Sequence, residues 1–196
     1  MGYLSDNCAF ALLTEQLIAQ SSSFACGNED LDSFFHSDFV AYAKVMFGKT
    51  YCFHEVNNPT QIVCAFTVSN ASIFTNRLPN ARKKKVSKEV PHVKQDLTYP
   101  AVLIGRLGID VQYQRLHIGS ELMDFIKSWF AEPENKTGCR YLVVDAYNCD
   151  TPITFYLKNG FDFVFSTEEQ EKEYRNIDSD DSLKTRLMYF DLIRIS

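Results

Sequence analysis

A strand, a polar turn and a helix follow one another in residues 101–129, AVLIGRLGIDVQYQRLHIGSELMDFIKSW. The predominantly apolar run of residues 101–110 predicts a strand that is buried on both faces. After the turn, apolar residues recur at helical spacing, at Ile118, Leu122, Phe125, Ile126 and Trp129. A helix N-terminus directly after a buried strand presents unpaired N–H groups and a partial positive charge. The turn therefore predicts an anion site suited to phosphate, whereas Gly119 alone also fits close packing of helix on sheet.

Strand and helix signals alternate along the rest of the chain. Strands are predicted at residues 8–13, 140–147, 161–166 and 186–193, and a β-hairpin at residues 49–56 and 61–69. Asn28 can cap a helix with apolar positions at Leu31, Phe34, Phe35, Phe39, Tyr42 and Met46. Thr151 and Pro152 open another helix, which Gly160 closes. The polar, basic residues 76–98 are predicted to form the longest loop.

This order of elements predicts an α/β (α+β) fold with a mixed sheet covered by helices. Strands 101–110 and 140–147, joined through a helix, are expected to run parallel with a right-handed crossover. A length of 196 residues with 45% hydrophobic residues predicts one domain, residues 1–196.

Composition excludes several classes of protein. No apolar stretch is long enough to cross a bilayer, and residues 1–10 lack a signal-peptide pattern, so we expect a cytoplasmic protein without a membrane partner. The six cysteines form no C-x-x-C pair and no cluster with histidine. That spacing predicts reduced thiols and no metal site.

Charge is unevenly distributed along a chain of net charge −5. The run ARKKKVSK (81–88) is basic and the stretch 166–181 is strongly acidic. Each run is expected to be a solvated loop, and the basic run is also a candidate contact for an anionic partner.

A second stretch, YNCDTPITFYLKNGF (147–161), bears on the turn at 114–119. Together the two stretches resemble the Gcn5-related N-acetyltransferase family (GNAT). That family holds the pyrophosphate of acetyl-CoA in a Q/R-x-x-G-x-G/A turn and often carries a helix ending F-Y-x-x-x-G-F. Gln114 and Gly119 match the turn, whereas His117 replaces its first glycine. The resemblance implies a mixed, mostly antiparallel central sheet splayed between two parallel strands, with helices on both faces.

The resemblance implies an acetyl-CoA-dependent N-acetyltransferase in which a primary amine attacks the thioester directly. Acetyl-CoA would lie between strands 101–110 and 140–147, and Tyr156 would protonate the leaving thiolate. The implied cofactor-binding residues are Leu107, Gly108 and Ile109 for the pantetheine arm, Gln114, Arg115, Leu116, His117, Ile118, Gly119 and Ser120 for the pyrophosphate, and Asn148. Without the motif, Tyr156 fits an ordinary half-buried helix tyrosine and Asn148 a turn former.

The group that neutralises the incoming amine stays open. Asp110 and Asp145 are candidates from strand ends, and each also fits a capping or pairing role. His54 and His92 have no supporting pattern.

Three N-terminal and central stretches sharpen the resemblance: FACGNEDLDSFF (24–35), ARKKKV (81–86) and LIGRLGIDVQYQ (103–114). They are similar to the acetyltransferase toxins of bacterial toxin–antitoxin pairs, which acetylate aminoacyl-tRNA and are held inactive by a small antitoxin. This implies an antitoxin partner and tRNA contacts through Arg82, Lys83, Lys84, Lys85 and Lys88. Negative net charge opposes RNA binding, and housekeeping acetyltransferases share the N-terminal pattern.

Two alternatives from other classes remain. One is a non-catalytic acyl-CoA-binding module, which His117 favours; the other is an RNA-binding or interaction module resting on the basic run alone. The acceptor is a small-molecule or macromolecular amine, and the chain is expected to be a monomer or homodimer. No G-x-S-x-G elbow supports a hydrolase.

Overall fold

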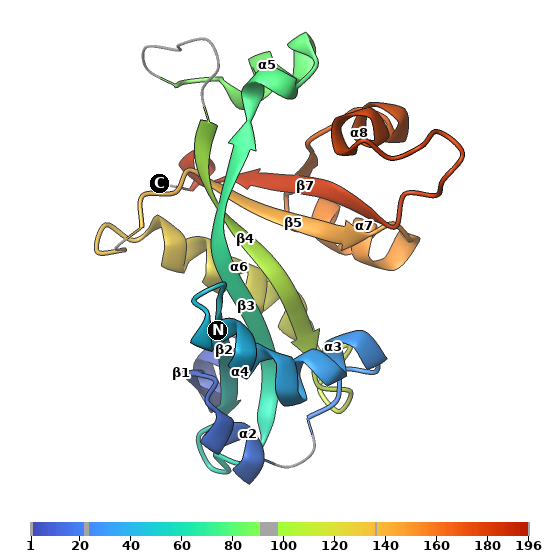
Figure 1. Ribbon diagram of the computed structural model, residues 1–196. Coiled ribbons are helices and arrows are strands. Elements are labelled where there is room, and N and C mark those ends of the chain that lie inside the picture. Colours follow the sequence, from blue (N-terminus) through green and yellow to red (C-terminus); the bar gives the residue numbers. More distant parts are fainter. Residues whose placement is uncertain (1, 22–23, 91–97, 136, 196) are drawn as a thin grey trace. The chain divides into compact units, whose positions relative to one another are not determined.

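The computed structural model describes residues 2–21, 24–90, 98–135 and 137–195 (Figure 1). The strands are β1 (Cys8–Leu12), β2 (Lys49–Glu55), β3 (Ile62–Phe74), β4 (Thr98–Ile109), β5 (Tyr141–Tyr147), β6 (Asp162–Phe163) and β7 (Thr185–Asp191). The α-helices are α1 (Tyr3–Asn7), α2 (Glu15–Gln20), α3 (Glu29–Ser33), α4 (Phe39–Lys44), α5 (Asn80–Val86), α6 (Ile118–Ala131), α7 (Asp150–Lys158) and α8 (Glu168–Arg175). A π-helical turn, η1 (Phe34–Asp38), joins α3 to α4, and the short 3₁₀ helices are η2 (Thr75–Arg77) and η3 (Leu192–Arg194).

The strands form one mixed sheet in the order β1-β2-β3-β4-β5-β7-β6. The β2–β3 hairpin is antiparallel, as predicted, and so are the β1–β2, β5–β7 and β6–β7 pairs. Two strands of the sheet run parallel, and helices complete the mixed α/β architecture. The predicted fold class is confirmed.

The chain divides into two compact units. Unit 1 comprises residues 1–69 and 104–126, and unit 2 comprises residues 70–103 and 127–196. The long strands β3 and β4 and the helix α6 contribute residues to both units.

Unit 1 has a core rich in phenylalanine. Phe34, Phe35 and Phe39 are buried on the helical run from α3 to α4 and pack with Leu13, Phe24, Cys52, Ile62 and Ala65. Asn28 caps this run as predicted, because its side chain accepts a hydrogen bond from the Leu31 N–H at 3.1 Å. Met46, predicted to share the apolar face, is instead 90% exposed, because α4 ends at Lys44 and Met46 has a φ of 58°.

Unit 2 corrects three predictions. The expected loop at residues 76–98 contains η2 and α5, because Leu78 and Val86 are buried with Tyr99, Tyr141 and Val164. The acidic stretch, expected to be a loop, forms α8. The predicted strand 161–166 is short, with only Asp162 and Phe163 in β6. Residues 91–97 lie outside the described residues.

Candidate functional site

The turn between β4 and α6 is organised by Asp110, whose side chain is fully buried. Its Oδ2 accepts a hydrogen bond from the Ala25 N–H at 3.1 Å, and its Oδ1 accepts one from the Gln112 N–H at 3.0 Å. The Asp110 N–H itself donates to the carbonyl of Val63 at 3.0 Å. Both carboxylate oxygens are therefore engaged in holding the turn, which is a structural role.

Gln114 braces the same turn through its side-chain amide. Its Nε2 donates to the carbonyls of Cys26 at 2.8 Å and Ile109 at 3.2 Å. The residue that matches the first position of the phosphate-binding pattern thus ties the turn to the end of β4 and to the segment before α3.

Left-handed backbone at Arg115 and His117 shapes the turn. Their φ angles are 65° and 61°, in the region that favours glycine. His117 stands where the pattern has glycine. Its backbone is nevertheless in the left-handed conformation that glycine adopts most readily.

Free N–H groups line this turn. The first N–H groups of α6 with a backbone partner are those of Ser120 and Glu121, which donate to the His117 carbonyl at 3.1 and 3.2 Å. Within the described chain, the N–H groups of residues 115–119 donate no backbone hydrogen bond. Those donors lie at the N-terminus of a 14-residue helix, where an anion is favoured.

The residues predicted to bind phosphate form one continuous segment of unit 1 and differ in exposure. Gln114, Arg115, Leu116, His117 and Ser120 are exposed, Gly119 is half-buried and Ile118 is buried. Leu107, Gly108 and Ile109 lie at the end of β4 in the same unit. An added Cβ at Gly108 would come within 3.2 Å of Phe35 and of the Cys26 sulfur, so a side chain there would crowd the packing against the segment around α3.

A carboxylate that sequence reasoning missed ties α1 to this turn. Glu55 Oε1 accepts hydrogen bonds from the hydroxyls of Tyr3 and of Tyr113, the latter at 2.8 Å. Hydrogen bonds from Tyr3 and then Tyr113 hold the pKa of Glu55 below its usual value. In the same region the Ser5 N–H donates to Glu121 Oε1 at 2.9 Å. No local pattern signals these contacts, because the partners are 52 to 116 residues apart.

Tyr156 lies on α7 in unit 2 and is half-buried. Its ring packs against Phe155 and Phe161, with centroids 5.1 and 5.3 Å away. Burial raises the pKa of Tyr156 to about 12, so its hydroxyl is protonated at neutral pH. Among the described residues no group hydrogen-bonds to that hydroxyl, which leaves it available as a donor.

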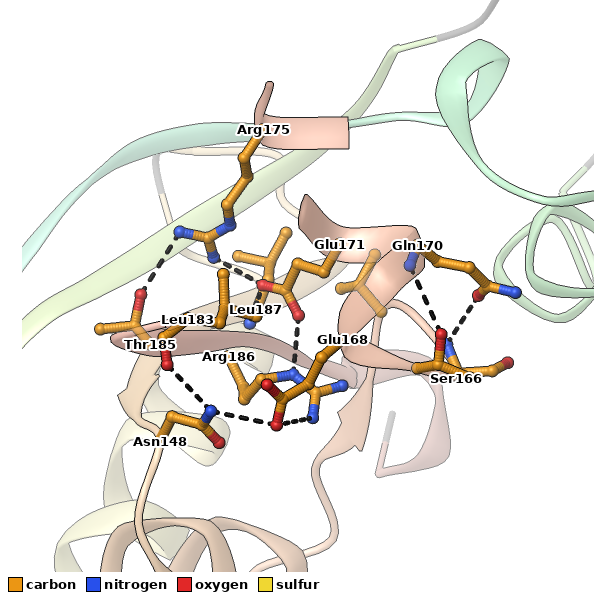
Figure 2. A network of polar contacts seen from close by, with 12 residues as sticks. Asn148, Ser166, Glu168, Gln170, Glu171, Arg175, Leu183, Thr185, Arg186 and Leu187 are labelled. Atoms are coloured by element: carbon orange, nitrogen blue, oxygen red, sulfur yellow. Dashed lines mark hydrogen bonds and ion pairs between the residues drawn. The ribbon is translucent and has the colours of Figure 1, made fainter. Parts of the chain in front are cut away.

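Asn148, also in unit 2, is committed to a polar network (Figure 2). Its Nδ2 donates to Glu168 Oε1 at 3.1 Å and to the Leu183 carbonyl at 2.9 Å. Both amide hydrogens therefore bind within the protein, and only the side-chain oxygen remains for the predicted contact with the cofactor arm.

The basic run is only partly free for an outside partner. Arg82 Nε donates to the Val164 carbonyl at 3.0 Å, and Lys85 pairs with Asp162 at 2.8 Å. Lys88 pairs with Glu89 at 3.4 Å. In the part of the chain that the structure describes, Lys83 and Lys84 form no such contact.

Most of the residues considered as general bases already bind other groups of the protein. Asp145 pairs with Arg175 at 2.5 Å. His54 Nδ1 lies 3.2 Å from the carbonyl of Glu55, and His92 is outside the described residues. The described residues contain no cluster of three or more histidine, cysteine or acidic side chains placed to hold a metal ion. No described helix has both the length and the apolar character that crossing a membrane requires.

Comparisons with known proteins give matches among solved structures only. No family model matches the sequence, and no curated protein matches it. A mutant of KacT superposes with a TM-score of 0.70 at 18% identity, covering 97% of this chain and 98% of that one. AtaT in complex with acetyl-methionyl-tRNAfMet gives 0.68 at 20% identity, with 96% of each chain covered.

A third match, AtaTR bound with acetyl-CoA, gives a TM-score of 0.62 at 20% identity and covers 97% of this chain and 96% of that one. At such low sequence identities, the structural similarity establishes the fold alone. The chain therefore adopts the fold shared by KacT and AtaT, a mixed α/β fold as the sequence predicted.

Proposed function

We propose that the chain is an acetyl-CoA-dependent N-acetyltransferase that moves an acetyl group from the thioester to a primary amine. The observation that carries this proposal is the turn before α6. Its left-handed residues and free N–H groups stand where the family pattern binds pyrophosphate. A fold shared with proteins solved with acetyl-CoA supports the same assignment.

In unit 1, the N–H groups of residues 115–120 would hold the diphosphate, and the charge of Arg115 would add to them. Gln114 would act by fixing the turn, since its amide is already bonded inside the protein. Backbone groups of Leu107, Gly108 and Ile109 would hold the pantetheine arm and polarise the acetyl carbonyl.

In unit 2, Tyr156 would assist departure of the thiolate. The amine nitrogen bonds to the carbonyl carbon, the C–S bond breaks, and the amine loses a proton. A phenol with a pKa of about 12 is a weaker acid than a thiol of pKa about 8.5. Tyr156 therefore stabilises the thiolate mainly as a hydrogen-bond donor, and the proton lost by the amine restores the thiol.

Aminoacyl-tRNA is the acceptor that we favour. AtaT, which has the same fold, was solved with acetyl-methionyl-tRNAfMet. Lys83 and Lys84 are the members of the basic run that remain available for phosphates. By the same reasoning an antitoxin is a candidate partner, because AtaT was also solved with the antitoxin AtaR.

Calorimetric titration with acetyl-CoA tests the proposal directly. We expect micromolar binding that weakens with a dephospho analogue, followed by transfer of labelled acetyl to an amine, with charged tRNA tried first. A bulky replacement, Gly119→Leu, should weaken binding. Its matched control is Gly138→Leu, because an added Cβ at Gly138 meets no atom of the part of the chain that the structure describes within 4 Å. Absence of binding at millimolar acetyl-CoA would refute the proposal, and binding without transfer to any amine would favour the non-catalytic module.

A further inference from the structure

Arg106 is an arginine in the interior of β4 that has no carboxylate partner among the described residues. Its Nη1 donates to the carbonyl of Gly105 at 2.9 Å, and its guanidinium carbon lies 5.3 Å from the centre of the Phe34 ring. Its Nε is buried and has no partner among the described groups. One face of the guanidinium is thus covered by Phe34, while a donor is left unused.

Four other arginines among the described residues bind carboxylates: Arg140 with Asp191, Arg175 with Asp145 and Glu171, Arg186 with Glu171, and Arg194 with Asp162. Arg82 instead donates its Nε to the Val164 carbonyl, so that its Nε, unlike that of Arg106, has a partner. A guanidinium presents a planar fork that matches a carboxylate or phosphate, and leaving it half-buried with only a carbonyl is unfavourable. The described residues supply no such partner to Arg106, and an anionic group of another molecule fits its free donor.

The guanidinium lies at a defined edge of β4. Backbone polar groups of a strand alternate between its two edges, so residues 105, 107 and 109 direct theirs to the same edge. Side-chain donors reach this edge at both ends: Arg106 at the Gly105 carbonyl and Gln114 at the Ile109 carbonyl. The Leu107 N–H is the next backbone donor along the edge from the Gly105 carbonyl.

The lack of a side chain at Gly105 leaves space for a ligand beside this part of β4. An added Cβ there would meet no atom of the described residues within 4 Å, unlike the one at Gly108. Packing within the described chain therefore gives no reason for a glycine in the middle of β4, where it weakens a strand. Close approach of another molecule gives such a reason.

We propose that Arg106 binds an oxyanion of the acceptor substrate, a carboxylate or a phosphate on the molecule that carries the reacting amine. This inference rests on the proposed function, in which the Leu107 backbone holds the acetyl carbonyl. The ion pair orients the acceptor beside the thioester. The positive charge of Arg106 also disfavours the ammonium form of a nearby amine, so it helps to supply the neutral nucleophile that no engaged base provides.

Oxyanion binding can be measured without knowing the acceptor. In the full-length protein, the Nε–Hε resonance of Arg106 is assigned by its loss in Arg106→Lys and is followed by NMR during titration with inorganic phosphate and with acetate. We expect a saturable shift with at least one of them, and a larger effect with phosphate would favour a nucleotide acceptor. Arg77→Gln, which removes an exposed arginine, should leave this shift unchanged. Absence of a shift with both anions overturns the proposal.

Kinetics test the role in the reaction. Acetyl transfer is compared for charged tRNA, free amino acids and spermidine, which carries no oxyanion. For an acceptor with an oxyanion, Arg106→Gln should lower kcat/KM about tenfold or more, since a charged hydrogen bond contributes about 1.5–3 kcal/mol. The acidic limb of its pH profile should move to higher pH, while acetyl-CoA affinity stays within about twofold of wild type.

Two kinetic results overturn the proposal: acetylation of spermidine alone, or equal kcat/KM for wild type and Arg106→Gln on every acceptor. Thermal unfolding of Arg106→Lys and Arg106→Gln checks that both variants fold. Failure of the wild type to bind acetyl-CoA is a different result. It refutes the proposed function and the acceptor role together, while the NMR titration still decides whether Arg106 binds an oxyanion.

Discussion

At the scale of single residues, the turn before α6 holds two side chains in left-handed backbone. An L-residue in this conformation loses about 1–2 kcal/mol relative to glycine, through contact of its Cβ with the following carbonyl. Arg115 and His117 both bear this cost in an exposed segment. The rest of the structure holds them there through Asp110 and Gln114, whose side chains bond the turn at both of its sides.

His117→Gly should relieve this strain. The gain is offset by about 0.5–1 kcal/mol of added entropy in the unfolded chain, so we expect a net stabilisation of up to about 1 kcal/mol in urea unfolding. Leu116→Gly is the matched control, because Leu116 is exposed in the same turn and its φ is not positive. It should lose about 0.5–1 kcal/mol. Equal destabilisation by the two changes would show that His117 is not strained.

Tyr156→Phe should lower kcat while leaving the Kd of acetyl-CoA nearly unchanged. The change removes only the hydroxyl, and the ring contacts with Phe155 and Phe161 persist. A loss of about 10- to 100-fold in kcat corresponds to one hydrogen bond to a developing charge. Tyr174→Phe, on α8 in the same unit, is the control. Unchanged turnover would remove Tyr156 from the mechanism.

The sequence located the turn itself. The turn at Gln114–Gly119 and the start of α6 at Ile118 lie where they were predicted, because backbone shape depends on adjacent residues, whereas phosphate binding at the turn stays a prediction. The sequence did not reveal that Gln114 acts as a brace, since its acceptors Cys26 and Ile109 come from separate segments. Glu55 was missed for the same physical reason.

At the scale of elements, two carboxylates join segments that are distant in sequence. Glu55 on β2 accepts hydrogen bonds from Tyr3 on α1 and Tyr113 in the turn before α6. Glu171 on α8 accepts them from the Leu187 N–H on β7 at 2.7 Å and from Arg175 and Arg186 at 2.7 and 2.9 Å (Figure 2). The first site is partly exposed and the second is fully buried.

Glu55→Gln should lower stability by about 1–2 kcal/mol at pH 7, because it weakens two hydrogen bonds to a charged acceptor. The pKa of Glu55 is lower in the folded than in the unfolded chain. The ionised carboxylate therefore adds to the free energy of unfolding above pH about 4.3, and this stabilisation is lost as pH falls through the folded pKa. Urea unfolding should show a constant difference from wild type between about pH 5 and 8 that shrinks below about pH 4.3. Glu134→Gln, an exposed change of equal charge, should show no difference. A pH-independent effect would contradict the assignment.

Glu171→Gln should lower stability by about 3–5 kcal/mol, the typical effect of breaking a buried ion pair from one side. The amide cannot accept from Arg175, Arg186 and the Leu187 N–H together, and its own N–H₂ then faces a guanidinium. Glu173→Gln changes the same charge on an exposed position of the same helix and should remain within about 0.5 kcal/mol of wild type. Equal urea midpoints for the two variants would mean that α8 is held by other contacts.

The formation of α8 shows why composition misled. The acidic run looked like a solvated loop, yet Thr167 caps the helix by accepting from the Gln170 N–H at 3.4 Å, and Gln170 Oε1 accepts from the Ser166 N–H at 3.1 Å. That Thr-x-x-Gln spacing is a helix-start signal that could have been found in the sequence. The pairing of Glu171 with arginines could not, because it depends on where β7 lies.

At the scale of the whole molecule, the sequence predicted each long strand and the mixed sheet, because apolar periodicity is local. It did not predict that β7 lies between β5 and β6, since strand order is decided by long-range pairing. The availability of charged side chains also depends on long-range contacts. A net charge of −5 and a basic run are visible in the sequence, but the run is divided by contacts with Asp162 and the Val164 carbonyl.

The proposed binding of tRNA should therefore depend on Lys83 and Lys84 rather than on the whole basic run. Each lysine that meets a phosphate contributes about one unit to the slope of log affinity against log salt. Lys83→Gln with Lys84→Gln should reduce that slope by about two units in fluorescence anisotropy titrations, with little change in stability. Lys85→Gln is the matched control, because Lys85 is paired with Asp162 and should affect stability more than the slope. An unchanged slope in the double variant, or an equal loss in Lys85→Gln, would move the tRNA contact away from α5.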